Sequence, residues 1–102
     1  MRFDLNDLND ARVADSSFER YYPADVNEAP DAEGVYVFTD KTAEVLYAGK
    51  SCGQGLKAEI VSKRNSSADR EAKRFRWFVT KSDADAEGLK TDWVAKYTPK
   101  FN

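Results

Sequence analysis

Histidine is absent from the sequence, and cysteine occurs once, as Cys52. Without histidine the chain cannot form a Ser-His-Asp or Cys-His catalytic unit, nor a histidine-ligated metal site. A single cysteine excludes an intramolecular disulfide and any zinc site built from several cysteines. Any catalysis must therefore use carboxylate, lysine, arginine, tyrosine or cysteine side chains. The alternative is that the chain binds a ligand without catalysis.

Long apolar runs are also lacking. No stretch approaches the roughly 20 apolar residues that span a bilayer, and the acidic residues 1–7 lack the apolar segment of a signal peptide. We therefore expect no membrane association and a cytoplasmic location. The 102 residues suffice for one domain, and the 2 Trp, 5 Tyr and 6 Phe are typical of a folded chain rather than a disordered one.

Charge is distributed unevenly along the chain. Residues 1–56 carry 5 basic and 11 acidic side chains, whereas residues 57–102 carry 11 basic and 7 acidic ones. The net charge of −2 therefore conceals a basic half that can meet phosphate groups. The alternative is that charged helices simply face water.

The sequence predicts three strands and two main helices. Residues 35–39 and 45–50 are apolar or β-branched runs separated by five polar residues, which favours an antiparallel hairpin. A helix begins at Leu56, a third strand covers residues 75–80, and a second helix begins at Asp83. We expect an α+β domain over residues 29–102, with a three-stranded antiparallel sheet flanked by helices.

Residues 1–28 are polar and acidic, with a weak helical pattern of apolar residues. We expect an acidic amino-terminal arm with one short helix.

Three segments match the pattern of one family. They are Gly34-Val35-Tyr36, then Tyr47-Ala48-Gly49-Lys50 after ten intervening residues, and the closing Tyr97-Thr98-Pro99-Lys100-Phe101-Asn102. The chain from about residue 29 to residue 102 thereby resembles the GIY-YIG nuclease superfamily, including the amino-terminal nuclease module of the excision-repair protein UvrC. The resemblance implies the same small sheet with helices around it.

It also implies hydrolysis of a nucleic-acid phosphodiester with one divalent metal ion. In the family, a tyrosine of the second half-motif is thought to deprotonate water, aided by a nearby lysine. An arginine on the first helix offsets the charge on the phosphate, and a glutamate on the late helix holds the metal. The resemblance makes Tyr36, Tyr47 and Lys50 the candidate catalytic residues and matches Asn102 to the terminal asparagine.

Two family positions are replaced. The arginine position of the first helix holds Glu59, and the metal-binding glutamate position holds Lys90. If the fold is shared, the resemblance implies that these two residues face one cleft and can pair. A protonated lysine repels a divalent ion and cannot ligate it. We therefore expect no cofactor and no cleavage, with Mg²⁺ or Mn²⁺ as the cofactor if the domain is active.

The sequence leaves three functions open. The first is a catalytically degenerate, monomeric domain that binds nucleic acid through a basic cleft. The second is an active endonuclease in which Lys57 replaces the arginine and Glu87 or Asp92 replaces the glutamate. The third is a protein-interaction module that uses the amino-terminal arm to hold a protein partner. The candidate nucleic-acid contacts are Lys50, Lys57, Lys63, Arg64, Arg70 and Asn102, whereas Phe75 and Trp77 are expected in the core.

Overall fold

The computed structural model describes residues 1–51 and 53–102, so Cys52 lies outside the described residues. An antiparallel sheet forms the centre of the molecule, with the strand order β1-β5-β3-β4, and β2 also pairs with β5. The strands are β1 (Val13–Ser16), β2 (Arg20–Tyr21), β3 (Gly34–Thr39), β4 (Val45–Lys50) and β5 (Arg74–Thr80).

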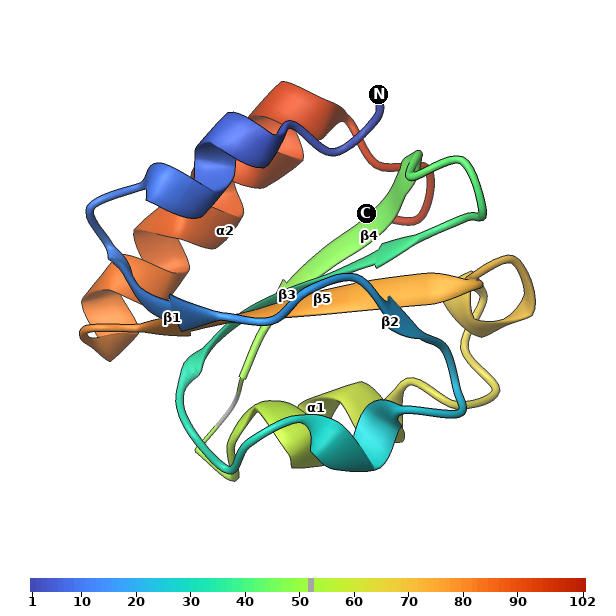
Figure 1. The fold of residues 1–102 in the computed structure, drawn as a ribbon, viewed down its shortest axis with the longest axis horizontal. Coiled ribbons are helices and arrows are strands. Elements are labelled where there is room, and N and C mark those ends of the chain that lie inside the picture. The colour runs from blue at the N-terminus through green and yellow to red at the C-terminus, as the bar shows by residue number, and fades with distance from the viewer. Residues whose placement is uncertain (52) are drawn as a thin grey trace.

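Two helices cover opposite faces of this sheet. Figure 1 shows α2 with the short helix η1 on one side and α1 with η2 on the other. A third short helix, η3, follows α1 and precedes β5 in the chain. The helical bounds are η1 (Leu5–Asn9), η2 (Val26–Glu28), α1 (Leu56–Ser62), η3 (Ala68–Arg70) and α2 (Asp83–Tyr97).

Strand alternation divides the core in two, because successive side chains of a strand point to opposite faces. Val35 and Val37 of β3 pack under α2, while Tyr36 and Phe38 pack under α1. All six residues of β3 are buried, since both faces of this central strand are covered. The motif that begins β3 therefore sends its tyrosine to the α1 face.

The helix α2 has clear end signals. The side chain of Ser82 accepts a hydrogen bond from the Asp85 backbone N–H, and Asp83 and Asp85 lie in the first turn, where the helix dipole favours acids. Thr98 ends the helix in the left-handed conformation, with φ of 42°, immediately before Pro99. These bounds agree with the prediction from the sequence.

The number of strands expected from the sequence was too low. The amino-terminal residues supply β1 and β2, both on β5, so the sheet has five strands rather than three. Phe3 and Tyr22 from the same segment are buried in the two halves of the core. The sequence signal was weak because β1 and β2 have only four and two residues, and none of their residues is fully buried.

No helix among the described residues is both long enough and apolar enough to cross a membrane.

Candidate functional site

The two motif tyrosines lie side by side on the α1 face of the sheet. In the β3–β4 register Tyr36 is opposite Gly49 and Phe38 is opposite Tyr47. The ring centroids of Tyr36 and Tyr47 are 6.0 Å apart. Tyr36 is completely buried, whereas Tyr47 is half-buried and reaches the surface. The family pattern thus brings its two tyrosines together.

The two motif glycines are required by close contacts. A Cβ on Gly49 would lie 2.6 Å from the Tyr36 ring, which covers this glycine from the opposite strand. A Cβ on Gly34 would lie 1.9 Å from the carbonyl oxygen of Phe78. Glycine at these positions lets the strands and the Tyr36 ring approach as closely as they do.

Glu59 connects the tyrosines to α1. The Tyr36 hydroxyl donates to Glu59 Oε1 at 3.3 Å, and Lys63 Nζ lies 3.7 Å from the same oxygen, one turn further along the chain. Lys63 Nζ also lies 5.2 Å from the centroid of the Tyr47 ring. The four side chains form a polar cluster, which we call the tyrosine cluster: Tyr36, Tyr47, Glu59 and Lys63.

Burial raises the pKa of Tyr36 well above its usual range, and the neighbouring Tyr47 and Glu59 add to the effect. The Tyr36 phenol is therefore neutral near neutral pH. In that state it donates a hydrogen bond and does not remove a proton from water.

Lys50 lies on the other side of the sheet. Its ammonium group contacts Asp83 at 2.8 Å and Glu87 at 3.6 Å, both on α2. The hydrogen bond to Asp83 raises the pKa of Lys50. The three candidate catalytic residues are thus divided, with the two tyrosines under α1 and Lys50 beside α2. The spacing of Tyr47 and Lys50 already indicated this division, because residues three apart on a strand point to opposite faces of the sheet.

Glu59 and Lys90 also belong to different faces. Glu59 is on α1 and Lys90 is on α2, and these helices cover opposite sides of the sheet (Figure 1). Among the described residues Glu59 forms its ion pair with Lys63, not with Lys90. The expected pairing of Glu59 with Lys90 does not form, because the sheet lies between the two helices that carry them, whereas Lys63, four residues after Glu59, lies beside it.

Asn102 holds the edge of the sheet. Its side-chain amide accepts a hydrogen bond from the Ala48 N–H and donates one to the Ala48 carbonyl, both at 2.8 Å. The backbone N–H of Phe101 donates to Leu46 O at 2.9 Å. The closing residues therefore pair with β4 as a short strand would, and the polar atoms of Asn102 are occupied by this role.

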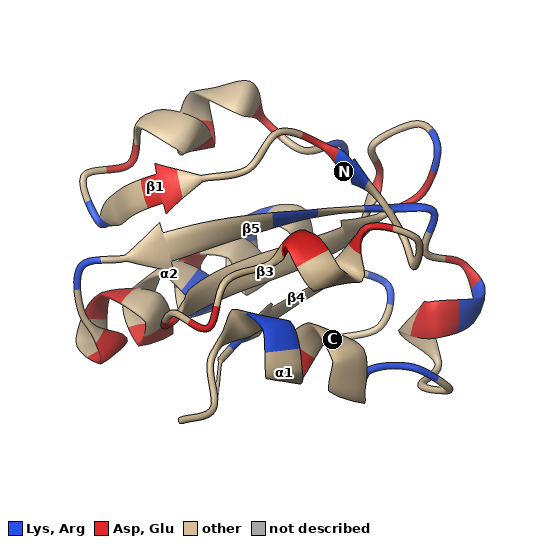
Figure 2. Cartoon of the chain, turned by 60° about the horizontal axis from the view of Figure 1, so that its bottom comes forward, with Lys and Arg blue, Asp and Glu red and all other residues tan. Residues whose placement is uncertain are grey.

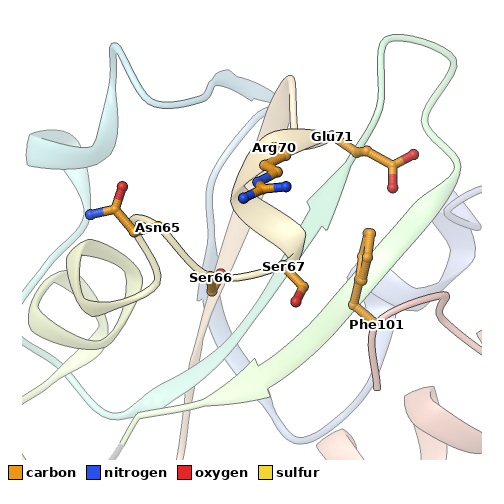
Figure 3. A pocket seen from close by; sticks show the side chains of 6 residues that line it. All are labelled: Asn65, Ser66, Ser67, Arg70, Glu71 and Phe101. Atoms are coloured by element: carbon orange, nitrogen blue, oxygen red, sulfur yellow. The ribbon is translucent and has the colours of Figure 1, made fainter.

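The tyrosine cluster borders the smaller of two adjoining hollows. The smaller, of about 210 Å³, is lined by Tyr47, Lys63, Ser66, Ser67, Ala68 and Phe101. The larger, of about 390 Å³, is lined by Asn65, Ser66, Ser67, Arg70, Glu71 and Phe101 (Figure 3). Ser66, Ser67 and Phe101 line both, so the hollows meet along these three residues. The sequence reasoning identified Lys63 and Arg70 but not the two serines or Phe101.

The remaining candidate contacts differ in their surroundings. Arg64 lies 3.5 Å from Asp69 and stacks over Tyr22. Lys57 lies half-buried in the first turn of α1. Figure 2 shows Lys and Arg on α1, on the loops beyond it and along β5, interspersed with Asp and Glu. The basic half of the sequence is therefore mixed with acids in space.

The two aromatic residues expected in the core differ in burial. Phe75 is completely buried, whereas Trp77 is half-buried at the edge of the same cluster.

The donor atoms near the tyrosines do not suit the divalent ion that the resemblance implies. Within residues 1–51 and 53–102 no group of three or more Asp, Glu, Cys or His could hold a metal. The carboxylate in the tyrosine cluster is Glu59, and Lys63 already lies within ion-pair distance of it. A cation entering here would compete with an ammonium group for one carboxylate.

Comparison with known proteins gives consistent matches. A sequence model of the family described as UvrC-like GIY-YIG domain matches residues 32–102. The UvrABC system protein C of Acidothermus cellulolyticus is 30% identical over 84 residues, covering 74% of this chain. That of Saccharopolyspora erythraea is 31% identical over 99 residues, covering 88% of this chain. In each case the chain spans only 13% of the relative.

A solved structure is similar over most of the fold. It is the GIY-YIG amino-terminal endonuclease domain of UvrC from Thermotoga maritima, bound to its catalytic divalent cation, magnesium. The TM-score is 0.68 at 27% sequence identity, and the match covers 78% of this chain and 92% of that one.

Proposed function

The chain belongs to the UvrC-like GIY-YIG domain family, and from this membership we propose that it binds nucleic acid without cleaving it. Its nuclease-like fold is common to the family. The proposal concerns what the replaced residues of this chain do with that fold.

The observation that carries the proposal is the placement of Glu59. At the position where the family has a phosphate-binding arginine, this chain has a carboxylate held by Tyr36 and Lys63. An anion there repels the charge that grows on a phosphate during hydrolysis. Lys63 shields Glu59, so a phosphate can approach the cluster. Within the described residues, the cation of the cluster, Lys63, is already paired with Glu59 and is less able to stabilise the transition state.

The position of the metal-binding glutamate supports the same conclusion. Lys90 occupies it, half-buried on α2. A lysine brings a positive charge where the family needs a ligand for a positive ion. The position of the phosphate-binding arginine and that of the metal-binding glutamate thus hold Glu59 and Lys90 instead.

Binding requires less than catalysis, namely cations placed around a surface that fits the ligand. Lys63 and Arg70 line the two hollows beside Tyr47. Arg70 is exposed, and among the described residues it forms no ion pair. We assign the phosphate contacts to Lys63 and Arg70, with Arg64 and Lys57 beside them. Lys50 and Asn102 are not included, because α2 and β4 hold their polar groups.

Binding is tested by fluorescence anisotropy with labelled oligonucleotides at several salt concentrations. We expect affinity to fall steeply with salt, because bound cations release counterions from the phosphates. Arg70→Gln should weaken binding and reduce the salt dependence. Lys81→Gln is the matched control, since this exposed lysine precedes α2 and lines neither hollow. Absent or salt-independent binding would overturn the proposal.

Cleavage is tested in parallel with Mg²⁺ and with Mn²⁺. We expect no cleavage by the wild-type chain. Metal-dependent cleavage by the wild type that disappears in Tyr47→Phe would instead identify an active endonuclease.

A further inference from the structure

The two adjoining hollows contain more than cations. Phe101, Ser66 and Ser67 line both of them. Figure 3 shows Phe101 standing across the larger hollow from Asn65, with Arg70 between them. An aromatic residue, two serines and two cations therefore border one continuous depression.

Phe101 is a fixed platform rather than a loose terminal residue. Its N–H donates to Leu46 O at 2.9 Å, and the next residue, Asn102, is tied to Ala48 by two hydrogen bonds. The ring is only half-buried, so part of it faces the hollows. A ring held in this way loses little conformational entropy when a flat group stacks on it.

Some polar groups around the depression can still bind a ligand. The Ser66 Oγ is buried and has no hydrogen-bond partner among the described residues. A buried hydroxyl without a partner costs free energy, and a ligand oxygen or nitrogen in the hollow would supply that partner once the Ser66 side chain rotates toward it. Glu71, the acid of the larger hollow, is held by Lys100 at 2.8 Å, which leaves Arg70 available for an anion.

We propose that the two hollows together hold one unstacked nucleotide of a single-stranded nucleic acid, an inference that rests on the nucleic-acid binding proposed above. The base stacks on Phe101, its phosphate is held by Arg70 and Lys63, and Ser66 Oγ bonds a polar atom of the nucleotide. The larger hollow, about 390 Å³, falls within the usual range for small ligands, about 300 to 1,000 Å³.

This arrangement selects against duplexes. A base within a duplex is stacked and paired on both sides, so it must be extruded before it can reach Phe101. Extrusion costs a few kcal/mol, whereas a base in a single strand is already available. Because every base has an aromatic face, the contact is tolerant of sequence.

The test uses the complete chain and labelled oligo(dT) and oligo(rU) strands of ~10 nucleotides, with a blunt duplex of the same length. At low salt we expect either single strand to bind about tenfold or more tightly than the duplex. Phe101→Leu keeps the apolar volume but removes the aromatic face. It should weaken single-strand binding by about fivefold or more, and Phe101→Tyr should retain the affinity.

Phe18→Leu is the matched control, because Phe18 is 85% exposed and lines neither hollow. Its single-strand affinity should equal that of the wild type. Equal affinity for strand and duplex, or wild-type affinity in Phe101→Leu, would overturn the nucleotide site and leave the proposed function standing. If the wild-type chain bound neither the single strands nor the duplex, the proposed function would be overturned, and the nucleotide site with it.

Discussion

The contact between Gly49 and the Tyr36 ring explains why a glycine follows the second motif tyrosine at this spacing. The two residues are opposite each other in the β3–β4 register, and the ring lies over the glycine. The hydroxyl of Tyr36 then reaches Glu59 on α1. One missing side chain on β4 therefore sets the position of a polar group under the helix.

Gly49→Ala tests this contact. The added methyl group would lie 2.6 Å from the ring of a fully buried side chain, which cannot move aside freely. We expect a loss of about 1–3 kcal/mol in the free energy of unfolding, measured by urea denaturation. A value within error of the wild type would contradict the account.

Gly88→Ala is the matched control, with the opposite expected sign. Gly88 lies within α2, and its added Cβ would meet only Nη1 of Arg12, at 3.2 Å. This guanidinium pairs with Asp10 and Asp92 and needs to shift by only a few tenths of an ångström to admit the methyl group. Alanine is the better helix former, so the free energy of unfolding should rise by about 0.5–1 kcal/mol.

Asp69 contributes to the decrease in the free energy of unfolding that we expect at acidic pH. The Tyr22 hydroxyl donates to Asp69 at 2.5 Å, and this bond, helped by the Asn65 N–H and Arg64, lowers the pKa of Asp69 from 3.8. The unfolded chain therefore takes up the proton first as the pH falls. The stabilisation by Asp69 is complete above the unfolded pKa and is lost as the pH falls through the folded one.

In Asp69→Asn we expect the free energy of unfolding to decline less between pH 4 and pH 2 than in the wild type, measured by denaturation at each pH. Tyr22→Phe removes the hydrogen-bond donor and should reduce the acid sensitivity in the same way. If the free energy of unfolding of both variants declined as steeply as that of the wild type, other carboxylates alone would cause the acid sensitivity.

Among the elements, β4 depends on a partner that is not a strand. One of its edges pairs with β3, and the other is covered by Phe101 and Asn102. An uncovered strand edge invites pairing with other chains. The closing asparagine thus protects the strand that carries Tyr47.

Asn102→Ala should expose this edge. Removing two hydrogen bonds should cost about 1–2 kcal/mol in the free energy of unfolding and should speed hydrogen exchange at the Ala48 amide. Asn27→Ala is the control, because Asn27 is exposed on η2. Unchanged exchange at Ala48 in Asn102→Ala would refute the covering role.

For the molecule as a whole, the amino-terminal residues belong to the same core as the family domain. Phe3 packs between α2 and the sheet, with ring centroids 5.6 Å from Phe78 and 5.7 Å from Trp93. Tyr22 packs on the other face, 4.7 Å from Phe38. The segment thus contributes to the core on both sides of the sheet.

Phe3→Ala should therefore destabilise the whole domain by about 3–5 kcal/mol, measured as a single cooperative transition in urea. Leu5→Ala, two residues away but 60% exposed, should change the stability by no more than about 0.5 kcal/mol. Similar effects of the two variants would mean that the segment is not part of the core.

Local features of the sequence determined much of this protein. Continuous apolar and β-branched runs defined β3 and β4, and capping residues set both ends of α2. The paired half-motifs indicated the family, and in this chain their glycines meet a steric requirement set by the β3–β4 register and by the Tyr36 ring.

Only the tertiary structure decided how the polar residues were paired. It separated Lys50 from the tyrosines, joined Glu59 to Lys63, gave Asn102 to the edge of β4, and brought Phe101 beside the serines that follow α1. It also drew the amino-terminal segment into the sheet. These outcomes depend on contacts between residues far apart in the chain, or on the face of the sheet to which a side chain points. Local propensity carries little information about such long-range contacts, because many partners are compatible with the same local pattern.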